Sequence, residues 1–311
     1  MRAGDPRAIA RTLTQVEDRC WQPETVDLLK ELFPHTGGAL VVGMTGSPGS
    51  GKSTLVDQLA GHYRSWGKKV GIIAVDPTSP FSGGAMLGDR IRMQSLSVDP
   101  GVFIRSMATR GQLGGLAPSI HEALLVLDAA GYQVLIVETV GVGQDEVAIV
   151  KAAHVSLVVL VPGMGDDIQA MKAGIMEIGD VFVINKADRE GVSKIEREIH
   201  ALLSLDSRKD GWNPPVIKTI ATRGDGIPEL ADAVHRYDAF RAQAEPRTRR
   251  SPSWFRDRLQ EMLKDRLMLW IQQRIPEKRM EYFSNKMIKR ELDPFTIVDR
   301  LLSEAGLEEK T

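Results

Sequence analysis

Seven short apolar runs, rich in β-branched residues, recur between about residue 39 and residue 221 of the chain. The runs show little alternation of polar and apolar positions, which is typical of strands covered on both faces. Longer segments with apolar residues at helical spacing separate them. The pattern therefore predicts an α/β fold, with a mostly parallel central sheet and helices on both faces. The expected strands lie at 39–46, 69–76, 101–106, 132–139, 155–162, 180–188 and 214–221.

Both ends of the chain show helical patterns without strands. Pro6 and Pro23 stand where two N-terminal helices would begin, and apolar residues follow each of them at helical spacing. Phe33 closes the second apolar set. After Glu245 a basic segment with Pro and Arg leads into a purely helical tail. We expect three parts, namely an N-terminal helical extension at 1–38, an α/β domain at 39–245 and a C-terminal helical arm at 246–311.

The tail carries a long apolar stripe. Ser251 and Pro252 fit the N-cap and first position of a helix that would be about 36 Å long. The stripe can cover the α/β domain of the same chain, or it can mediate self-association. Its place beyond a basic linker favours self-association, as does a net basic tail on a net acidic remainder. The stripe residues recur every four positions and are Phe255, Leu259, Leu263, Leu267, Ile271 and Ile275.

A glycine-rich segment, GSPGSGKS at 46–53, follows the first expected strand and precedes a helical pattern. It fits the P-loop pattern G-x-x-x-x-G-K-[ST] in the required strand-to-helix setting. Backbone N–H groups of such a loop converge on phosphate oxygens, and the helix N-terminus adds its positive end. Lys52 would bridge the β- and γ-phosphates, and the Ser53 hydroxyl would bind Mg²⁺. The expected phosphate-binding residues are Ser47, Pro48, Gly49, Ser50, Gly51, Lys52, Ser53 and Thr54.

A second motif predicts which base is bound. Asn185, Lys186 and Asp188 form an N-K-x-D pattern at the end of a later strand. A carboxylate at the Asp188 position can accept from guanine N1–H and from the 2-amino group, neither of which adenine offers on that edge. Ala221 and Thr222 follow the next strand, where a backbone N–H commonly meets the guanine carbonyl. The pattern predicts GTP or GDP as the ligand.

Three carboxylates lie near expected strand ends or in a neighbouring loop. Asp76, Asp89 and Glu138 offer hard oxygen ligands of the kind that Mg²⁺ prefers. The segment Glu138 to Gly141 resembles the D-x-x-G switch of GTPases with Glu in place of Asp. We expect Gly141 to donate its backbone N–H to the γ-phosphate. We expect Lys52, Asp76 and Gln144 to act in catalysis, with Gln144 orienting the attacking water, although an inert role for Gln144 stays open.

Composition narrows the class of protein. With 42% hydrophobic and 26% charged residues and a net charge of −1, the chain is typical of globular domains, and nothing favours nucleic acid or an anionic membrane as a partner. It lacks an apolar run long enough to span a bilayer and an apolar N-terminal signal. Cys20 is its single cysteine, so no disulfide is expected. We expect a cytoplasmic protein.

Four longer segments resemble one family of GTPases. They are VDPTSPFSGGAMLGDRIRM, RSMATRGQLGGLA, ETVGVGQDE and VPGMGDDIQAMKAGIMEIGDVFVINKAD. The chain is similar to the MeaB/MMAA family, SIMIBI-class P-loop GTPases that act as chaperones of adenosylcobalamin-dependent acyl-CoA mutases. The resemblance implies Mg²⁺-dependent GTP hydrolysis, a homodimer formed through the C-terminal arm and an acyl-CoA mutase as partner. It places Ser53, Asp76, Asp89 and Glu138 in the magnesium region, and Asp166 and Lys172 in a switch segment that responds to the mutase.

The function implied is that the GTP state gates loading or release of cobalamin on the mutase, and no cobalamin site is expected on this chain. Three alternatives stay open. A metal-delivering maturation GTPase would show His or Cys clusters, whereas the six histidines here are scattered. A P-loop kinase would need an acceptor pocket with a base, for which we find no H-R-D type motif. A module that binds GTP without hydrolysing it is the third.

Overall fold

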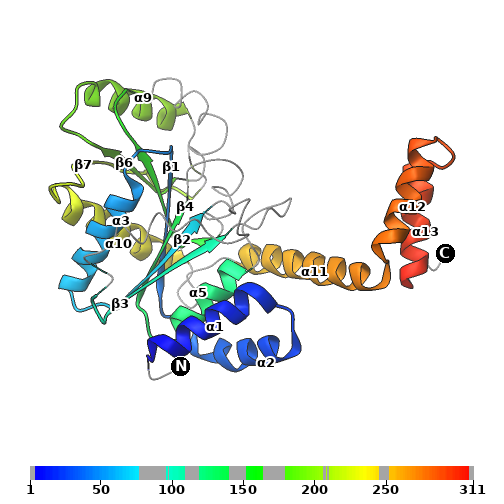
Figure 1. Cartoon of the computed structure of the whole chain (residues 1–311). Helices are drawn as coiled ribbons and strands as arrows, with labels where there is room; N and C mark the ends of the chain where they lie inside the picture. Colours follow the sequence, from blue (N-terminus) through cyan, green and yellow to red (C-terminus); the bar gives the residue numbers. More distant parts are fainter. Residues whose placement is uncertain are drawn as a thin grey trace. The chain divides into compact units, whose positions relative to one another are not determined.

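The computed structural model describes residues 4–76, 96, 98–108, 119–139, 152–163, 179–205, 208, 210–244 and 252–307 (Figure 1). Packing divides the chain into two units, Met1–Arg249 and Arg250–Thr311. The first unit holds the sheet, and the described part of the second unit is helical.

The chain begins with two helices, α1 (Pro6–Arg19) and α2 (Pro23–Leu32), followed by the short 3-10 turn η1 (Phe33–His35). Pro6 and Pro23 occupy the first helical positions, as the sequence pattern predicts. The Asp5 carboxylate caps α1 by accepting from the Arg7 N–H at 3.0 Å. Phe33, the last residue of the second apolar set, lies just beyond the end of α2, and its side chain is 62% exposed.

The strand prediction is confirmed. A seven-stranded sheet runs in the order β3-β2-β4-β1-β5-β6-β7, and every pairing is parallel. The strands are β1 (Leu40–Gly46), β2 (Val70–Asp76), β3 (Val102–Ala108), β4 (Val134–Thr139), β5 (Val155–Leu160), β6 (Val181–Asn185) and β7 (Val216–Thr219).

Strand β1 lies at the centre of the sheet, between β4 and β5. Met44 pairs with Glu138 of β4, and Gly46 pairs with Val159 of β5. Since all strands are parallel, their carboxyl ends meet at one edge. The chain passes from β4 on one side of β1 to β5 on the other. This edge is the kind of place where open α/β sheets bind ligands.

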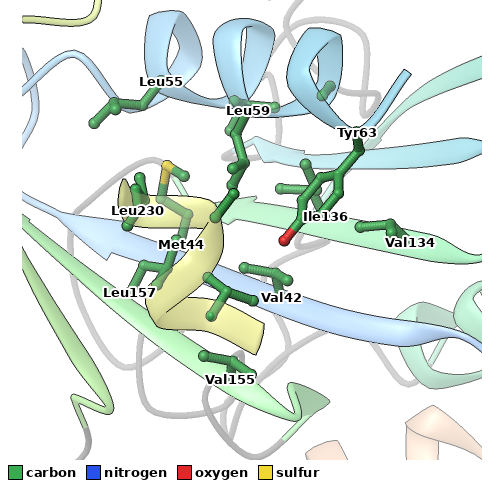
Figure 2. Close-up of a cluster of buried hydrophobic side chains, with 14 of the residues drawn as sticks. Val42, Met44, Leu55, Leu59, Tyr63, Val134, Ile136, Val155, Leu157 and Leu230 are labelled. Carbon is green, nitrogen blue, oxygen red and sulfur yellow. The ribbon is translucent and has the colours of Figure 1, made fainter. Parts of the chain in front are cut away.

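Helices cover both faces of the sheet, as expected from the double-sided burial of its strands. One face packs against α3 (Lys52–Ser65) and α10 (Ile227–Ala244). The other packs against α1 and α5 (Ser119–Ala129), and α9 (Val192–Leu205) covers β5 and β6. Figure 2 shows Leu55, Leu59 and Tyr63 of α3 lying over the side chains of the central strands.

Tyr63 places a phenol inside this core, fully buried, and its hydroxyl makes no hydrogen bond to a described residue. An unpaired buried polar group costs about 1–3 kcal/mol. Tyr63→Phe is therefore expected to leave the free energy of unfolding unchanged or to raise it by about 1 kcal/mol. Urea unfolding followed by circular dichroism measures the difference.

Tyr237 is the matched control, because it is also buried but its hydroxyl accepts from the Arg208 guanidinium at 3.0 Å. Tyr237→Phe removes that acceptor and is expected to lower the free energy of unfolding by about 1 kcal/mol. If both variants lose the same free energy of unfolding, the Tyr63 hydroxyl is not unpaired.

The C-terminal unit contains α11 (Pro252–Arg274), α12 (Glu277–Ile288) and α13 (Pro294–Ala305) (Figure 1). Asp293 caps α13 by accepting from the Thr296 N–H at 2.9 Å, and Arg279 of α12 donates to Glu304 of α13 at 2.9 Å. Four residues of the expected stripe are exposed, whereas Ile275 at its end is buried. The exposed four are Phe255, Leu259, Leu263 and Leu267.

Across the described helices of both units, none combines the length and the apolar character that crossing a membrane requires.

Candidate nucleotide-binding site

The glycine-rich segment forms a tight loop between the central strand β1 and the helix α3 that follows it. β1 ends at Gly46 and α3 begins at Lys52, and Gly49 and Gly51 adopt φ values of 77° and 89°. These left-handed conformations suit glycine and bend the chain sharply into the helix. The opening turn of α3 thus presents backbone N–H groups, with the positive end of the helix, beside the loop.

Two glycines permit close approaches that a side chain would block. A Cβ atom at Gly46 would lie 2.2 Å from the carbonyl oxygen of Val159 on the neighbouring strand. A Cβ atom at Gly51 would lie 2.4 Å from the amide nitrogen of Asn185. The first glycine lets the loop leave the sheet, and the second lets the N-K-x-D segment touch the loop.

Lys52 lies within the loop. Its side chain is buried, and Nζ donates to the carbonyl oxygens of Gly46 at 2.6 Å and Ser47 at 3.0 Å. These contacts hold a positive charge inside the loop, where a P-loop would bind a phosphate group. A phosphate group bound there gains a charge-assisted hydrogen bond from an ammonium group that is already positioned.

Ser53 and Glu138 meet across the edge of the sheet. The Ser53 hydroxyl donates to Glu138 Oε1 at 2.7 Å, and Glu138 is buried near the end of β4. A hydroxyl and a carboxylate in contact are hard oxygen donors, so the pair fits Mg²⁺. The described residues contain no group of three His, Cys, Asp or Glu side chains that could hold a metal. Asp76 ends β2, but its side chain lies outside the description.

Asn185 joins the two motifs. Its Nδ2 donates to the Ser50 carbonyl of the P-loop at 2.8 Å. Its Oδ1 accepts from the Thr219 hydroxyl at 3.1 Å and from the Ala221 N–H at 3.2 Å. One buried amide therefore ties the P-loop to the ends of β6 and β7.

Lys186 adds a second contact with the P-loop, and Asp188 lies at the surface of the same segment. Lys186 adopts a left-handed φ of 56°, and its Nζ donates to the Gly49 carbonyl at 2.7 Å. The Asp188 side chain is exposed, as is Thr222, whereas Ala221 is buried. The structure thus brings the N-K-x-D segment and the segment after β7 to the same side of the P-loop.

The sequence pattern did not mark two residues of this region. Thr219 holds Asn185, and Arg223 lies 3.9 Å from Asp188. The only signal for Thr219 was its place at the end of a strand, before Ala221. Nothing in the residue pattern distinguished Arg223 from an ordinary surface arginine.

Several expected site residues fall outside the described part of the chain, and their roles stay predictions. They are Asp89, Gly141, Gln144, Asp166 and Lys172.

A central parallel strand that runs into a phosphate loop, linked through Asn185 to an N-K-x-D segment, defines the class of protein as a P-loop GTPase. Within that class the chain belongs to the MeaB family. Residues 9–274 match the family described as "Methylmalonyl Co-A mutase-associated GTPase MeaB".

Individual relatives agree with this assignment. A putative GTPase of Pyrococcus abyssi is 46% identical, over 98% of this chain and 94% of its own length. The mitochondrial methylmalonic aciduria type A homolog of Caenorhabditis elegans is 38% identical, over 63% of this chain and 50% of its own length. Among solved structures, the crystal structure of an LAO/AO transport system kinase is similar with a TM-score of 0.71 and 28% identity, over 97% of this chain and 94% of the other.

Proposed function

We propose that this GTPase assembles, protects or reactivates an adenosylcobalamin-dependent acyl-CoA mutase, and that its GTP state gates loading or release of the cofactor. The match to the MeaB family over residues 9–274 carries the proposal, because the description of that family names methylmalonyl-CoA mutase. The name of the C. elegans relative, a methylmalonic aciduria type A homolog, points to the same metabolism.

The P-loop would supply most of the stabilisation of the reacting phosphates. Lys52 and the N–H groups at the start of α3 would stabilise negative charge on the phosphate oxygens during transfer to water. Ser53 and Glu138 would hold Mg²⁺, which neutralises phosphate charge when bound. We propose Asp76 and Asp89 as further members of this magnesium region.

The remaining roles concern the base and the switch. We propose that Asp188 reads guanine N1–H and the 2-amino group. The Ala221 N–H donates to Asn185 Oδ1, so a guanine carbonyl would have to share this donor. Gly141 is proposed to sense the γ-phosphate and Gln144 to orient water. Asp166 and Lys172 are proposed to couple the nucleotide state to the mutase.

Single-turnover hydrolysis of labelled GTP, with and without a candidate cobalamin-dependent mutase, tests the function. We expect slow hydrolysis by the GTPase alone and a faster rate when its cognate mutase is present. The partner can complete the arrangement around the attacking water, an effect that reaches about 10³-fold or more where a protein supplies a missing group.

Asp166→Ala and Lys172→Ala refine the same experiment. Both are expected to keep the basal rate and to lose the response to the mutase, since they stand outside the phosphate-binding motifs. If panels of methylmalonyl-, isobutyryl-, hydroxyisobutyryl- and ethylmalonyl-type mutases all leave the rate unchanged, the proposed partner class is wrong, whereas the GTPase assignment stands.

We also propose that the protein is a homodimer through its C-terminal arm. Leu259 and Leu263 on α11 are 60% and 68% exposed, which leaves a row of leucines in contact with water. Burial of one such side chain in an interface contributes about 1.5–3 kcal/mol. Because the row follows i to i+4 positions, two copies can interlock their ridges at a crossing angle of about −50°.

Sedimentation equilibrium at micromolar concentration tests the dimer. The unmodified chain is expected to sediment at twice its mass of 34.2 kDa, and Leu263→Glu at the single mass. Gln272→Glu is the control, because Gln272 is exposed and lies nine residues on, about half a turn around the same helix. An unmodified chain that stays at 34.2 kDa refutes the dimer.

A further inference from the structure

Arg223 lies beside the proposed guanine-reading carboxylate. Its terminal guanidinium nitrogen is 3.9 Å from Asp188 Oδ2, and the two side chains are 63% and 42% exposed. An exposed ion pair of this kind adds little to stability, with a typical contribution of about 0–1 kcal/mol. The ion pair with Asp188 therefore contributes little to the fold, and the guanidinium is available for another role.

The backbone around Arg223 is held in a tight turn after β7. Ile220 and Asp225 form an isolated bridge, in which the Ile220 N–H donates to the Asp225 carbonyl at 3.1 Å. The Arg223 N–H donates to the Ile220 carbonyl at 2.9 Å. Gly226 is left-handed with φ of 77°, and a Cβ there would lie 2.1 Å from the Lys218 carbonyl oxygen. The turn thus holds the backbone of Arg223 in place next to the N-K-x-D segment.

The guanidinium has donors to offer a ligand. A separation of 3.9 Å exceeds hydrogen-bond distance, and within the described part of the chain the Arg223 side chain makes no hydrogen bond. Ala221 and Thr222 were the two residues expected to offer a backbone N–H to a guanine carbonyl, and the Ala221 N–H is directed at Asn185 Oδ1 at 3.2 Å. A carboxylate acceptor and a guanidinium donor therefore lie side by side, while the Ala221 N–H is already engaged.

This acceptor-donor pair is complementary to one base edge. Guanine presents N1–H as a donor next to the acceptor O6, whereas adenine presents the acceptor N1 next to the 6-amino donor. We propose that Arg223 is a specificity-determining residue that donates to the O6 carbonyl of guanine, while Asp188 accepts from N1–H and the 2-amino group. The inference rests on the proposed reading of guanine by Asp188. Against adenine, both side chains would face a group of the same hydrogen-bonding sense.

Competition binding on the full-length protein tests the role of Arg223. A fluorescent GDP analogue is displaced by GDP, by IDP, and by the diphosphate of 2-aminopurine riboside, which lacks O6. Arg223→Ala is expected to weaken GDP and IDP about tenfold, equivalent to one charge-assisted hydrogen bond, and to leave the 2-aminopurine nucleotide unchanged. Arg223→Lys is expected to restore part of the loss, because it keeps a donor and the charge.

Lys218→Ala is the matched control. Lys218 lies on β7 and pairs with Glu196 at 2.9 Å with 48% exposure, so its loss removes a nearby exposed ion pair and is expected to leave all three affinities unchanged. If Arg223→Ala weakens all three nucleotides equally, or none, the inference is overturned. If the unmodified protein binds GDP no more tightly than ADP, the guanine assignment itself fails.

Discussion

Lys52→Ala is expected to lower kcat for GTP hydrolysis by at least about 100-fold while the protein stays folded. The ammonium group is held by the Gly46 and Ser47 carbonyls, where it would stabilise the negative charge that develops on the phosphate oxygens during hydrolysis. Alanine removes that charge from a buried position, and water cannot replace it at the same place. Single-turnover hydrolysis at saturating GTP and Mg²⁺ measures the loss.

Lys194→Ala serves as its control, because Lys194 is exposed on α9 and lies outside the P-loop. Circular dichroism and thermal unfolding of both variants separate lost chemistry from lost structure. Hydrolysis by folded Lys52→Ala at a rate close to that of the unmodified protein would show that the segment at 46–53 is not the catalytic P-loop.

Asp188→Asn is expected to reverse the base preference from guanine toward xanthine. An amide can donate to the 2-carbonyl of xanthine, whereas the carboxylate can only accept. The variant also replaces a charged acceptor by a neutral amide, so GDP affinity is expected to fall about 10- to 100-fold. Displacement of a fluorescent nucleotide by GDP, XDP and ADP measures the three affinities.

Glu190→Gln is the control. Glu190 is an exposed carboxylate two residues further along the same loop, and this substitution removes one negative charge, as Asp188→Asn does. Its GDP preference is expected to match that of the unmodified protein. If the unmodified protein binds GDP and ADP with equal affinity, Asp188 does not read guanine.

The local pattern of apolar and polar residues was enough to predict the strands of the sheet. All seven expected strands are present, because runs such as Val155–Leu160 are buried on both faces and contain the β-branched residues that strands favour. The start of α13 also depends on neighbouring residues alone, since Asp293 caps the helix and Pro294 supplies a fixed φ within one turn. Phe33 shows the limit, because helical spacing alone does not reveal that α2 ends before it.

The exposure of the α11 stripe required the structure. Leu263 and Ile275 belong to the same four-residue repeat, yet one is exposed and the other is buried near the junction with α12. Periodicity identifies an apolar side of a helix, but not which neighbour covers it. The buried residues of the C-terminal unit also come from α12 and α13, as Phe283 and Ile297 show.

The sequence by itself determined the parallel α/β class, the glycine loop with Lys52 and Ser53, and the guanine motif, because each depends on residues close together along the chain. Only the tertiary structure decided that Asn185 bonds Ser50, 135 residues earlier, that Ser53 meets Glu138, and that Arg223 lies beside Asp188. These contacts depend on strand order, which places β1 between β4 and β5 and brings distant strand ends to one edge. Strand order follows from how the helices and strands pack together, and no local periodicity encodes it.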